Sequence, residues 1–171
     1  TEYMYQGING EFIELTNVGA SAVDMTGWSM DDNTNAPGSF SLSALGSVAA
    51  GESVVITESA EATFRAAWNL APTVKILGGS GVAAGLGRND TINVYNASSA
   101  LVDQLAYGDQ TFAGSIRTQN VSGWICTEGL GATPGNSPYT AAKTVVELSF
   151  LPWREVLEGY NVDFLISYDS E

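Results

Sequence analysis

The sequence predicts an all-β fold, in which several short strands form an antiparallel sandwich or barrel interrupted by one short connecting helix. Three observations support this prediction. Apolar and polar residues alternate over most of the first two-thirds of the chain, Gly, Asn and Ser turns separate the alternating runs, and a single segment has helical spacing. A length of 171 residues fits one domain with a short appendage and allows a sizeable apolar core.

The first strand is expected at residues 11–18. There Ile13 and Leu15 point to one face, whereas Phe12 points to the other face together with the polar residues of the run. The strand should end at the turn signal Asn17–Gly19.

The second run, at residues 22–32, alternates again around a bulge expected at Gly27. Five more strand segments follow, of which the first is edge-like, the second is buried on both faces and the last two form a hairpin: 40–42, 52–58, 74–77, 91–96 and 101–108. The core residues predicted from this alternation are Ile13, Leu15, Trp28, Val55, Ile92, Val94 and Leu105.

The connecting helix is expected after Ser59, which can cap it. Phe64, Ala67 and Trp68 then share one face, and Asn69–Pro72 ends the helix. The helical spacing therefore predicts a helix that packs on the sandwich.

Charge and composition exclude several classes of function. The chain has no histidine and one cysteine, which excludes a Ser-His-Asp triad, a His-ligated zinc site and an intrachain disulfide. A formal net charge of −13 disfavours nucleic acid and anionic lipid as partners and favours cationic ones. No apolar run is long enough for a membrane span, and no cofactor is predicted. The many small residues and few lysines are typical of exported bacterial proteins, so we expect an extracellular or cell-surface location.

The glycine-rich stretch at residues 76–90 resembles a dinucleotide-binding fingerprint, with Gly79 and Gly81 in place and Asp103 where a ribose partner would lie. That fingerprint must lead directly into a helix. Here, further glycines and then a strand follow Ala84, so the sequence predicts a connection between strands and no nucleotide site.

No local spacing places two carboxylates together for acid–base chemistry. Glu11 and Glu14 should point to opposite faces, Asp31 and Asp32 diverge, and Glu52 and Glu58 share a face about 20 Å apart. The segment Asp31–Asn35 loosely resembles a calcium loop, but it lacks the glycine and distant glutamate of an EF-hand, and an Asp/Asn-rich turn after a strand explains it adequately. Catalytic, cofactor-binding and metal-ligating residues are therefore not assigned, and calcium binding at Asp31–Asn35 stays open.

Other candidates have simple structural explanations. Cys126 is expected to be a buried thiol, since no histidine can activate it. Arg88 and Arg117 are expected to pair with Asp90 and Glu128. Glycosylation sequons at Asn89, Asn96 and Asn120 matter only in a eukaryotic secretory pathway.

Several ordered motifs resemble the lamin tail domain family. Its opening pattern, Glu-hydrophobic-Ile/Val-Glu-Leu, Asn-x-Gly and Asp-Leu-x-Gly-Trp, is matched at Glu11, Ile13, Glu14, Leu15, Asn17, Gly19, Asp24, Gly27 and Trp28, with Met25 in the leucine position. Residues 48–58 are similar to the family's Leu-x-Pro-Gly segment, with Ala50 in place of the proline. Residues 85–109 resemble its late hairpin, and residues 131–137 resemble its usual ending.

The resemblance covers residues 1–137 and implies an immunoglobulin-like β-sandwich, followed by an extension at 138–171 of unknown role. Bacterial members resemble accessory modules on exported proteins, often beside hydrolases, or on surface proteins, and have no catalytic residues to transfer. Animal members bind proteins and, by some accounts, DNA, which the net charge of −13 disfavours here. We therefore expect a non-catalytic module that contacts an unknown protein or surface partner.

Two alternatives stay open at this point. One is a hydrolase with a carboxylate site formed by tertiary contacts, with or without calcium. The other concerns residues 138–171, where 152–158 has the pattern of a short helix and 162–168 that of a strand. Such a strand could pair across a symmetry axis and form a homodimer.

Overall fold

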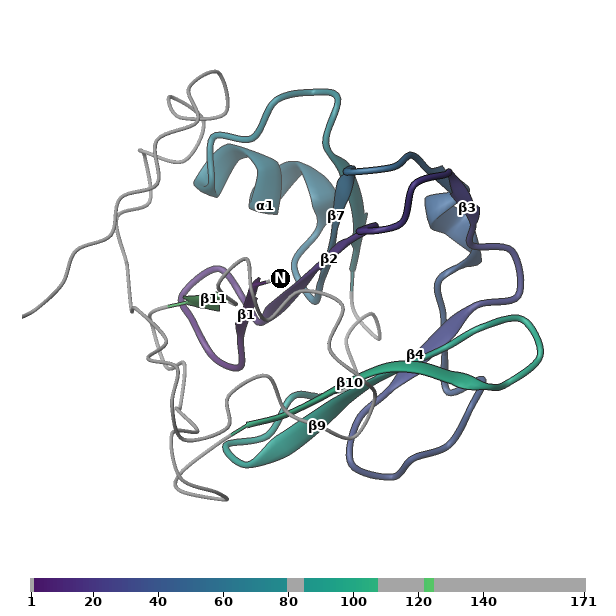
Figure 1. Ribbon diagram of the computed structural model, residues 1–171. Coiled ribbons are helices and arrows are strands. Elements are labelled where there is room, and N and C mark those ends of the chain that lie inside the picture. The colour runs from purple at the N-terminus through teal and green to yellow at the C-terminus, as the bar shows by residue number, and fades with distance from the viewer. Residues whose placement is uncertain (1, 80–84, 108–121, 125–171) are drawn as a thin grey trace, which may run out of the picture.

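A computed structural model of the protein describes residues 2–79, 85–107 and 122–124. Two main β-sheets face each other, and the short helix α1 (Glu61–Ala67) lies on the outer side of one of them (Figure 1). No helix in the three described ranges is both long and apolar enough to cross a membrane. The architecture confirms the predicted immunoglobulin-like β-sandwich with one short helix.

The first sheet has five strands in the order β11-β1-β2-β7-β8. These strands are β11 (Gly123–Trp124), β1 (Glu2–Met4), β2 (Phe12–Thr16), β7 (Ser53–Thr57) and β8 (Lys75–Gly78). Neighbouring strands run antiparallel, except that β8 is parallel to β7. The sequence did not predict β1 and β11, because runs this short show no clear alternation.

The second sheet has four antiparallel strands in the order β10-β9-β4-β5. These strands are β10 (Leu101–Tyr107), β9 (Asp90–Tyr95), β4 (Ser29–Asp31) and β5 (Phe40–Ser41). The predicted hairpin is confirmed as β9 and β10, and the predicted edge strand is confirmed as β5. A small separate sheet pairs β3 (Val23–Asp24) with β6 (Ser47–Val48), and a 3₁₀ helix, η1 (Ser43–Leu45), precedes β6.

The prediction of one bulged strand over residues 22–32 was wrong. A tight turn separates β3 from β4, and the two strands belong to different sheets. In this turn the Trp28 N–H donates to the Met25 carbonyl at 2.9 Å, and Gly27 has a φ of +77°. A glycine suits this third turn position because a side chain there would be strained. The same glycine that suggested a bulge therefore moves the chain from one sheet to another.

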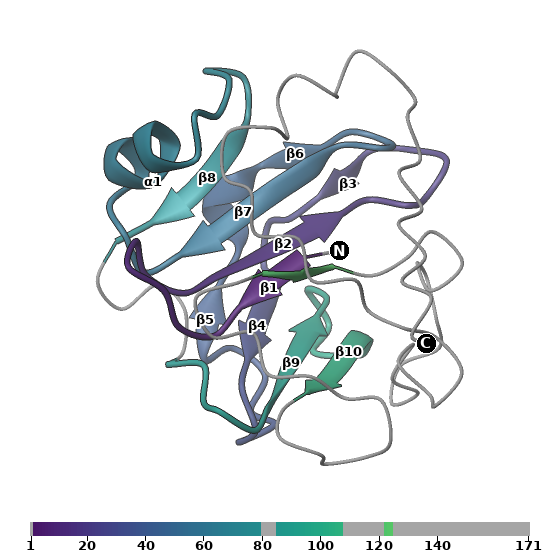
Figure 2. The ribbon, with the colours of Figure 1, turned by 90° about the vertical axis from the view of Figure 1, so that its left-hand side faces the viewer.

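Helix α1 explains why β8 can run parallel to β7, because parallel neighbours need a crossover connection. The helix packs beside β8 at the edge of the first sheet (Figure 2). Phe64 is buried and Trp68 packs against it, as predicted. The prediction that Ser59 caps the helix was wrong: the N-cap is Ala60, and the Ser59 hydroxyl donates to the Asn9 carbonyl.

The main core lies between the two sheets and confirms four predicted residues, Ile13, Ile92, Val94 and Leu105. Leu15 and Trp28, also predicted as core residues, pack against this core and are partly buried. Val55 is buried on the opposite face of the first sheet, in a second cluster with Met4, Phe12 and Phe64. Apolar residues thus cover both faces of β7, as predicted.

Candidate functional site

The glycine-rich stretch forms no nucleotide-binding helix in the residues that the structure describes. β8 ends at Gly78, residues 80–84 lie outside the described part, and residues 85–89 are not helical before β9 begins at Asp90. Leu86 is buried in the main core, and Asp103 is an exposed residue of β10. Residues 85–89 therefore serve as the connection into the β9–β10 hairpin.

Buried polar side chains attach this connection to the sandwich. A Glu11 carboxylate oxygen accepts a hydrogen bond from the Leu86 N–H at 3.0 Å, and the Asp90 carboxylate accepts one from the Gly87 N–H at 2.6 Å. The Tyr107 hydroxyl donates to the Gly87 carbonyl at 2.8 Å. Glu11 and Asp90 are only 5% and 8% exposed. This arrangement pairs the N–H groups of Leu86 and Gly87 and the carbonyl of Gly87 beside the buried Leu86 side chain.

The environment of Glu11 perturbs its ionisation. Burial raises the pKa of the Glu11 carboxyl to about 7, against the hydrogen bonds from Leu86 and Gly85, and the charges of Glu58 and Asp90 raise it further. A carboxyl that titrates near neutrality has the chemistry of a general acid, as the hydrolase alternative requires. Here, however, the carboxylate binds the backbone of its own domain, so the geometry assigns it to the stability of the connection.

The acidic segment Asp31–Asn35 binds its own backbone. Asp31 accepts hydrogen bonds from the Thr34 hydroxyl at 2.8 Å and the Ala36 N–H at 2.6 Å, and Asp32 accepts one from the Thr34 N–H at 3.0 Å. These are contacts of an Asp-rich turn. Within the described ranges, no three His, Cys, Asp or Glu side chains gather in a way that could hold a metal ion. The structure thus gives these carboxylates a role in the turn.

The remaining sequence candidates divide into two groups. Arg88 is exposed, and its predicted ion pair with Asp90 stays a prediction. The Asn96 carboxamide accepts hydrogen bonds from Ser98 and Ala100 and so stabilises the hairpin turn. Several other candidates lie outside the described residues: Arg117, Asn120, Cys126, Glu128 and the segments 152–158 and 162–168.

A pocket of about 460 Å³ lies between α1 and the outer face of the first sheet. Strands β2 and β7 form its floor, and its walls come from α1, from the segment that follows the helix and from the turn before β7. It is lined by Phe12, Glu14, Gly51, Glu52, Ser53, Val55, Phe64, Trp68, Leu70, Thr73 and Val74. We name it the α1 pocket.

Three aromatic rings form one side of the α1 pocket. Phe64 and Trp68 are stacked with their ring centroids 5.5 Å apart, and the Phe12 ring lies edge-on to both, at 5.3 and 4.8 Å. The Trp68 indole N–H is buried and has no hydrogen-bond partner in the described part of the chain. Aromatic walls with a few polar groups are typical of ligand sites.

Two carboxylates also line the α1 pocket. Glu14 shares the outer face of β2 with Phe12, and Glu2 of β1 lies directly opposite Glu14 in the strand register. Glu52 contributes a second carboxylate, which is paired with Lys75, and no lysine or arginine is among the described residues that line the pocket. The predicted divergence of Glu11 and Glu14 is confirmed, since Glu11 binds the connection to β9 while Glu14 lines this pocket.

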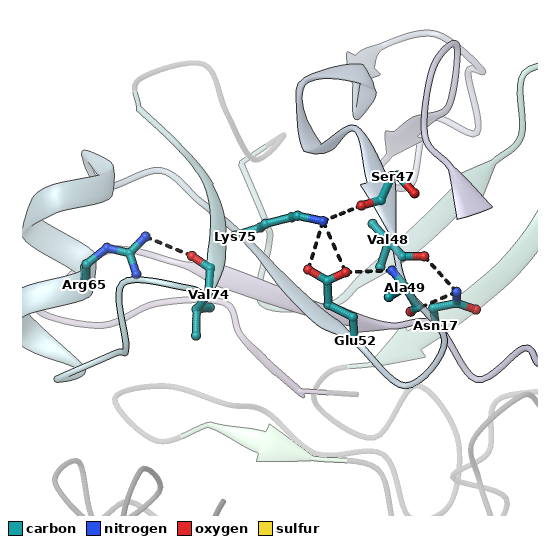
Figure 3. Close-up of polar contacts among 8 residues, drawn as sticks. All are labelled: Asn17, Ser47, Val48, Ala49, Glu52, Arg65, Val74 and Lys75. Atoms are coloured by element: carbon teal, nitrogen blue, oxygen red, sulfur yellow. Dashed lines mark hydrogen bonds and ion pairs between the residues drawn. The ribbon is translucent and has the colours of Figure 1, made fainter. Parts of the chain in front are cut away.

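Polar contacts hold the rim of the α1 pocket in place (Figure 3). The Lys75 ammonium pairs with the Glu52 carboxylate at 2.9 Å, and Glu52 also accepts the Ala49 N–H at 2.6 Å. On the helix side, the Arg65 guanidinium donates to the Val74 carbonyl at 2.9 Å. These contacts therefore connect the rim segments to neighbouring parts of the domain.

Alternation alone did not reveal the α1 pocket. It correctly put Phe12 and Glu14 on one face of the strand, and helical spacing put Phe64 and Trp68 on one face of the helix. The parallel crossover from β7 to β8 could have shown that these two faces meet, because it places α1 over the outer face of the sheet.

Comparison with known protein families identifies the family of this chain. The model of the Lamin Tail Domain family matches residues 1–109, a range that includes every strand from β1 to β10. No curated protein and no solved structure shows significant similarity to the chain. The matched region is a non-catalytic module, and strand β11 extends the first sheet beyond it. Because the match spans more than half of its length, the chain belongs to the lamin tail domain family.

Proposed function

We propose that this chain is a binding module of an exported or cell-surface bacterial protein. In this role it contacts a protein or surface partner, or serves as an accessory domain beside a hydrolase. The observation that supports the proposal most directly is the α1 pocket, which Trp68, Glu14 and Glu52 line on the outer face of the first sheet, within a domain of a non-catalytic family. Such a site suits binding, because it has convergent polar groups beside an apolar wall.

The net charge of −13 narrows the partner class. A surface with this charge repels phosphate backbones and attracts basic surfaces, so it favours a basic protein over nucleic acid. The small residues and few lysines of the chain support an exported location.

Two experiments test the proposal. The full-length protein that carries this chain is tagged within the domain, and intact cells are treated with protease. We expect the tag to be removed or to occur in the medium, while a cytoplasmic marker survives. Protection of the tag in intact cells would refute export.

Cross-linking on intact cells, with and without the domain, tests the interaction. We expect a cross-linked partner that is present only when the domain is present. Identical cross-links in both cases would refute the binding role.

A further inference from the structure

We propose that the α1 pocket is filled by a segment of this same chain, residues 148–153, when no partner is bound. A partner that uses the pocket must then displace this segment. The inference goes beyond the proposed function, because it concerns the pocket before a partner arrives. It rests on the apolar surface around the pocket, on the strand register and on the composition of the segment.

The α1 pocket keeps apolar surface that its own floor does not cover. Phe12 and Phe64 are packed and buried, but Trp68, Leu70 and Val74 line the pocket and are only partly buried. They lie beside a volume of about 460 Å³. Removing apolar surface from water is favourable, so this site is stabilised by an apolar segment that covers it.

The Trp68 indole N–H gives a second reason to expect a covering polypeptide. It is buried and has no acceptor among the described residues, although buried polar groups normally have a partner. A polypeptide that lies beside this ring brings backbone carbonyl oxygens, which are strong acceptors. A segment of chain therefore fits the site better than a purely apolar molecule.

The strand register brings the chain close to the α1 pocket where β11 ends. Trp124 of β11 lies opposite Glu2, and Glu2 lies opposite Glu14, which lines the pocket. At about 4.8 Å between neighbouring strands, the Trp124 and Glu14 backbones are about 10 Å apart.

The direction of β11 also leads the chain toward the pocket. β11 and β2 are both antiparallel to β1, so β11 runs in the same direction as β2, toward the end of the sheet where Thr16 pairs with Ser53. Ser53 belongs to the lining of the pocket. Residues 125–147 form a connection long enough to bring residues 148–153 to this place.

Residues 148–153 lie outside the described part, and their composition suits the site. They include no charged residue and four large apolar ones, Leu148, Phe150, Leu151 and Trp153. Such an apolar run is not typical of a free linker. The other apolar run of this region, residues 162–168, includes Asp163, and a charge is costly to bury. Residues 148–153 are therefore the better occupant.

Spin labels on the full chain test the proposal. Cys126→Ser removes the only cysteine, and Ser149→Cys then allows a nitroxide to be attached within the proposed segment. Ser167→Cys is the matched control in the other apolar run. The Trp68 indole signal of the ¹⁵N-labelled chain is assigned by its loss in Trp68→Phe. We expect the label in Ser149→Cys to abolish this signal and the label in Ser167→Cys to leave it.

The outcomes separate the possible occupants. Retention of the Trp68 signal with the label in Ser149→Cys, or equal loss with both labels, would overturn the proposal. A spin-labelled chain without ¹⁵N is also mixed with a ¹⁵N-labelled chain that has no spin label. Loss of the Trp68 signal in this mixture would assign the segment to a second copy and would also overturn it.

A pair of matched substitutions adds an independent measurement. Phe150→Ser should shift the Trp68 indole signal, whereas Phe164→Ser should not, and equal shifts would contradict the assignment to residues 148–153. If Phe150→Ser does not fold, the spin labels decide. The protease and cross-linking experiments test the proposed function separately, so the two failures are distinguishable.

Discussion

Replacing Glu11 by glutamine should change how the stability of the protein depends on pH. Glu11 is 5% exposed, and its carboxylate accepts the Leu86 N–H at 3.0 Å. Glutamine keeps an oxygen in the same place, so this hydrogen bond survives while the buried negative charge is lost. The pH dependence of the difference therefore reports the charge, whereas a change in the contact with Gly85 adds an offset that does not vary with pH.

The sign and size of the effect follow from the pKa. Burial raises the pKa of Glu11 from 4.5 to about 7, so between these values the folded protein binds more protons than the unfolded chain. Stability contributed by this group is then complete below pH 4.5 and falls as pH rises through 7. Since each pKa unit is worth about 1.4 kcal/mol, the wild type should lose roughly 3 kcal/mol relative to Glu11→Gln across this window.

Urea unfolding of both proteins at half-unit steps from pH 4 to pH 8.5 measures this difference. The gap between the two free energies of unfolding should widen from pH 4.5 and level off above pH 7.5. Asp103→Asn, an exposed change of the same charge, should run parallel to wild type within about 0.5 kcal/mol. A constant gap between Glu11→Gln and wild type at every pH would refute the argument that a buried charge destabilises the fold.

Three further predictions concern packing and hydrogen bonds, each measured by chemical denaturation. Phe64→Ala should cost about 3–5 kcal/mol because this ring is 1% exposed, whereas Trp28→Ala should cost less because Trp28 is only partly buried; the reverse order would contradict the assignment of the second cluster. Gly78→Ala should lower the free energy of unfolding by about 1–3 kcal/mol, since a Cβ would lie 2.5 Å from the Ser59 carbonyl oxygen. An unchanged denaturation midpoint would show that the chain around Ser59 and α1 can move away. Asn17→Ala removes donations to the carbonyls of Ser21, Val48 and Ala49 and should cost roughly 1–3 kcal/mol, with Asn17→Asp as the control that keeps the acceptor of the Gly19 N–H.

The sequence could predict the strands whose two faces differ clearly or are both apolar. In β2, Ile13 faces the main core while Phe12 faces α1, and strict alternation showed both directions. In β7, apolar residues run continuously because the strand is covered on each side. The hairpin of β9 and β10 was predictable from its short connection.

Depth of burial and choice of neighbour could not be predicted in the same way. Alternation gives the face of Leu15 but not the depth of its burial, so it could not predict that this side chain is only partly buried. The split between β3 and β4 depends on which partners the chain finds, β6 for one and β5 and β9 for the other. Such pairings are set by tertiary contacts far away in the sequence.

The same reasoning applies to the candidate site. Glu14 and Trp68 are far apart in the chain, and each has an ordinary explanation in its own segment. Only the crossover through α1 brings them to one pocket. Single-segment patterns therefore predicted the parts of the α1 pocket without predicting the pocket.

The pairing of β1 with β11 has a consequence for how the protein is made. Strand β1 finds its outer neighbour only at Gly123–Trp124, so one edge of β1 stays open until the intervening residues have been synthesised. At ordinary elongation rates that interval is on the order of ten seconds. During this time an uncovered strand edge is available to other nascent chains. Slow translation between these two points should therefore increase misassembly of the protein.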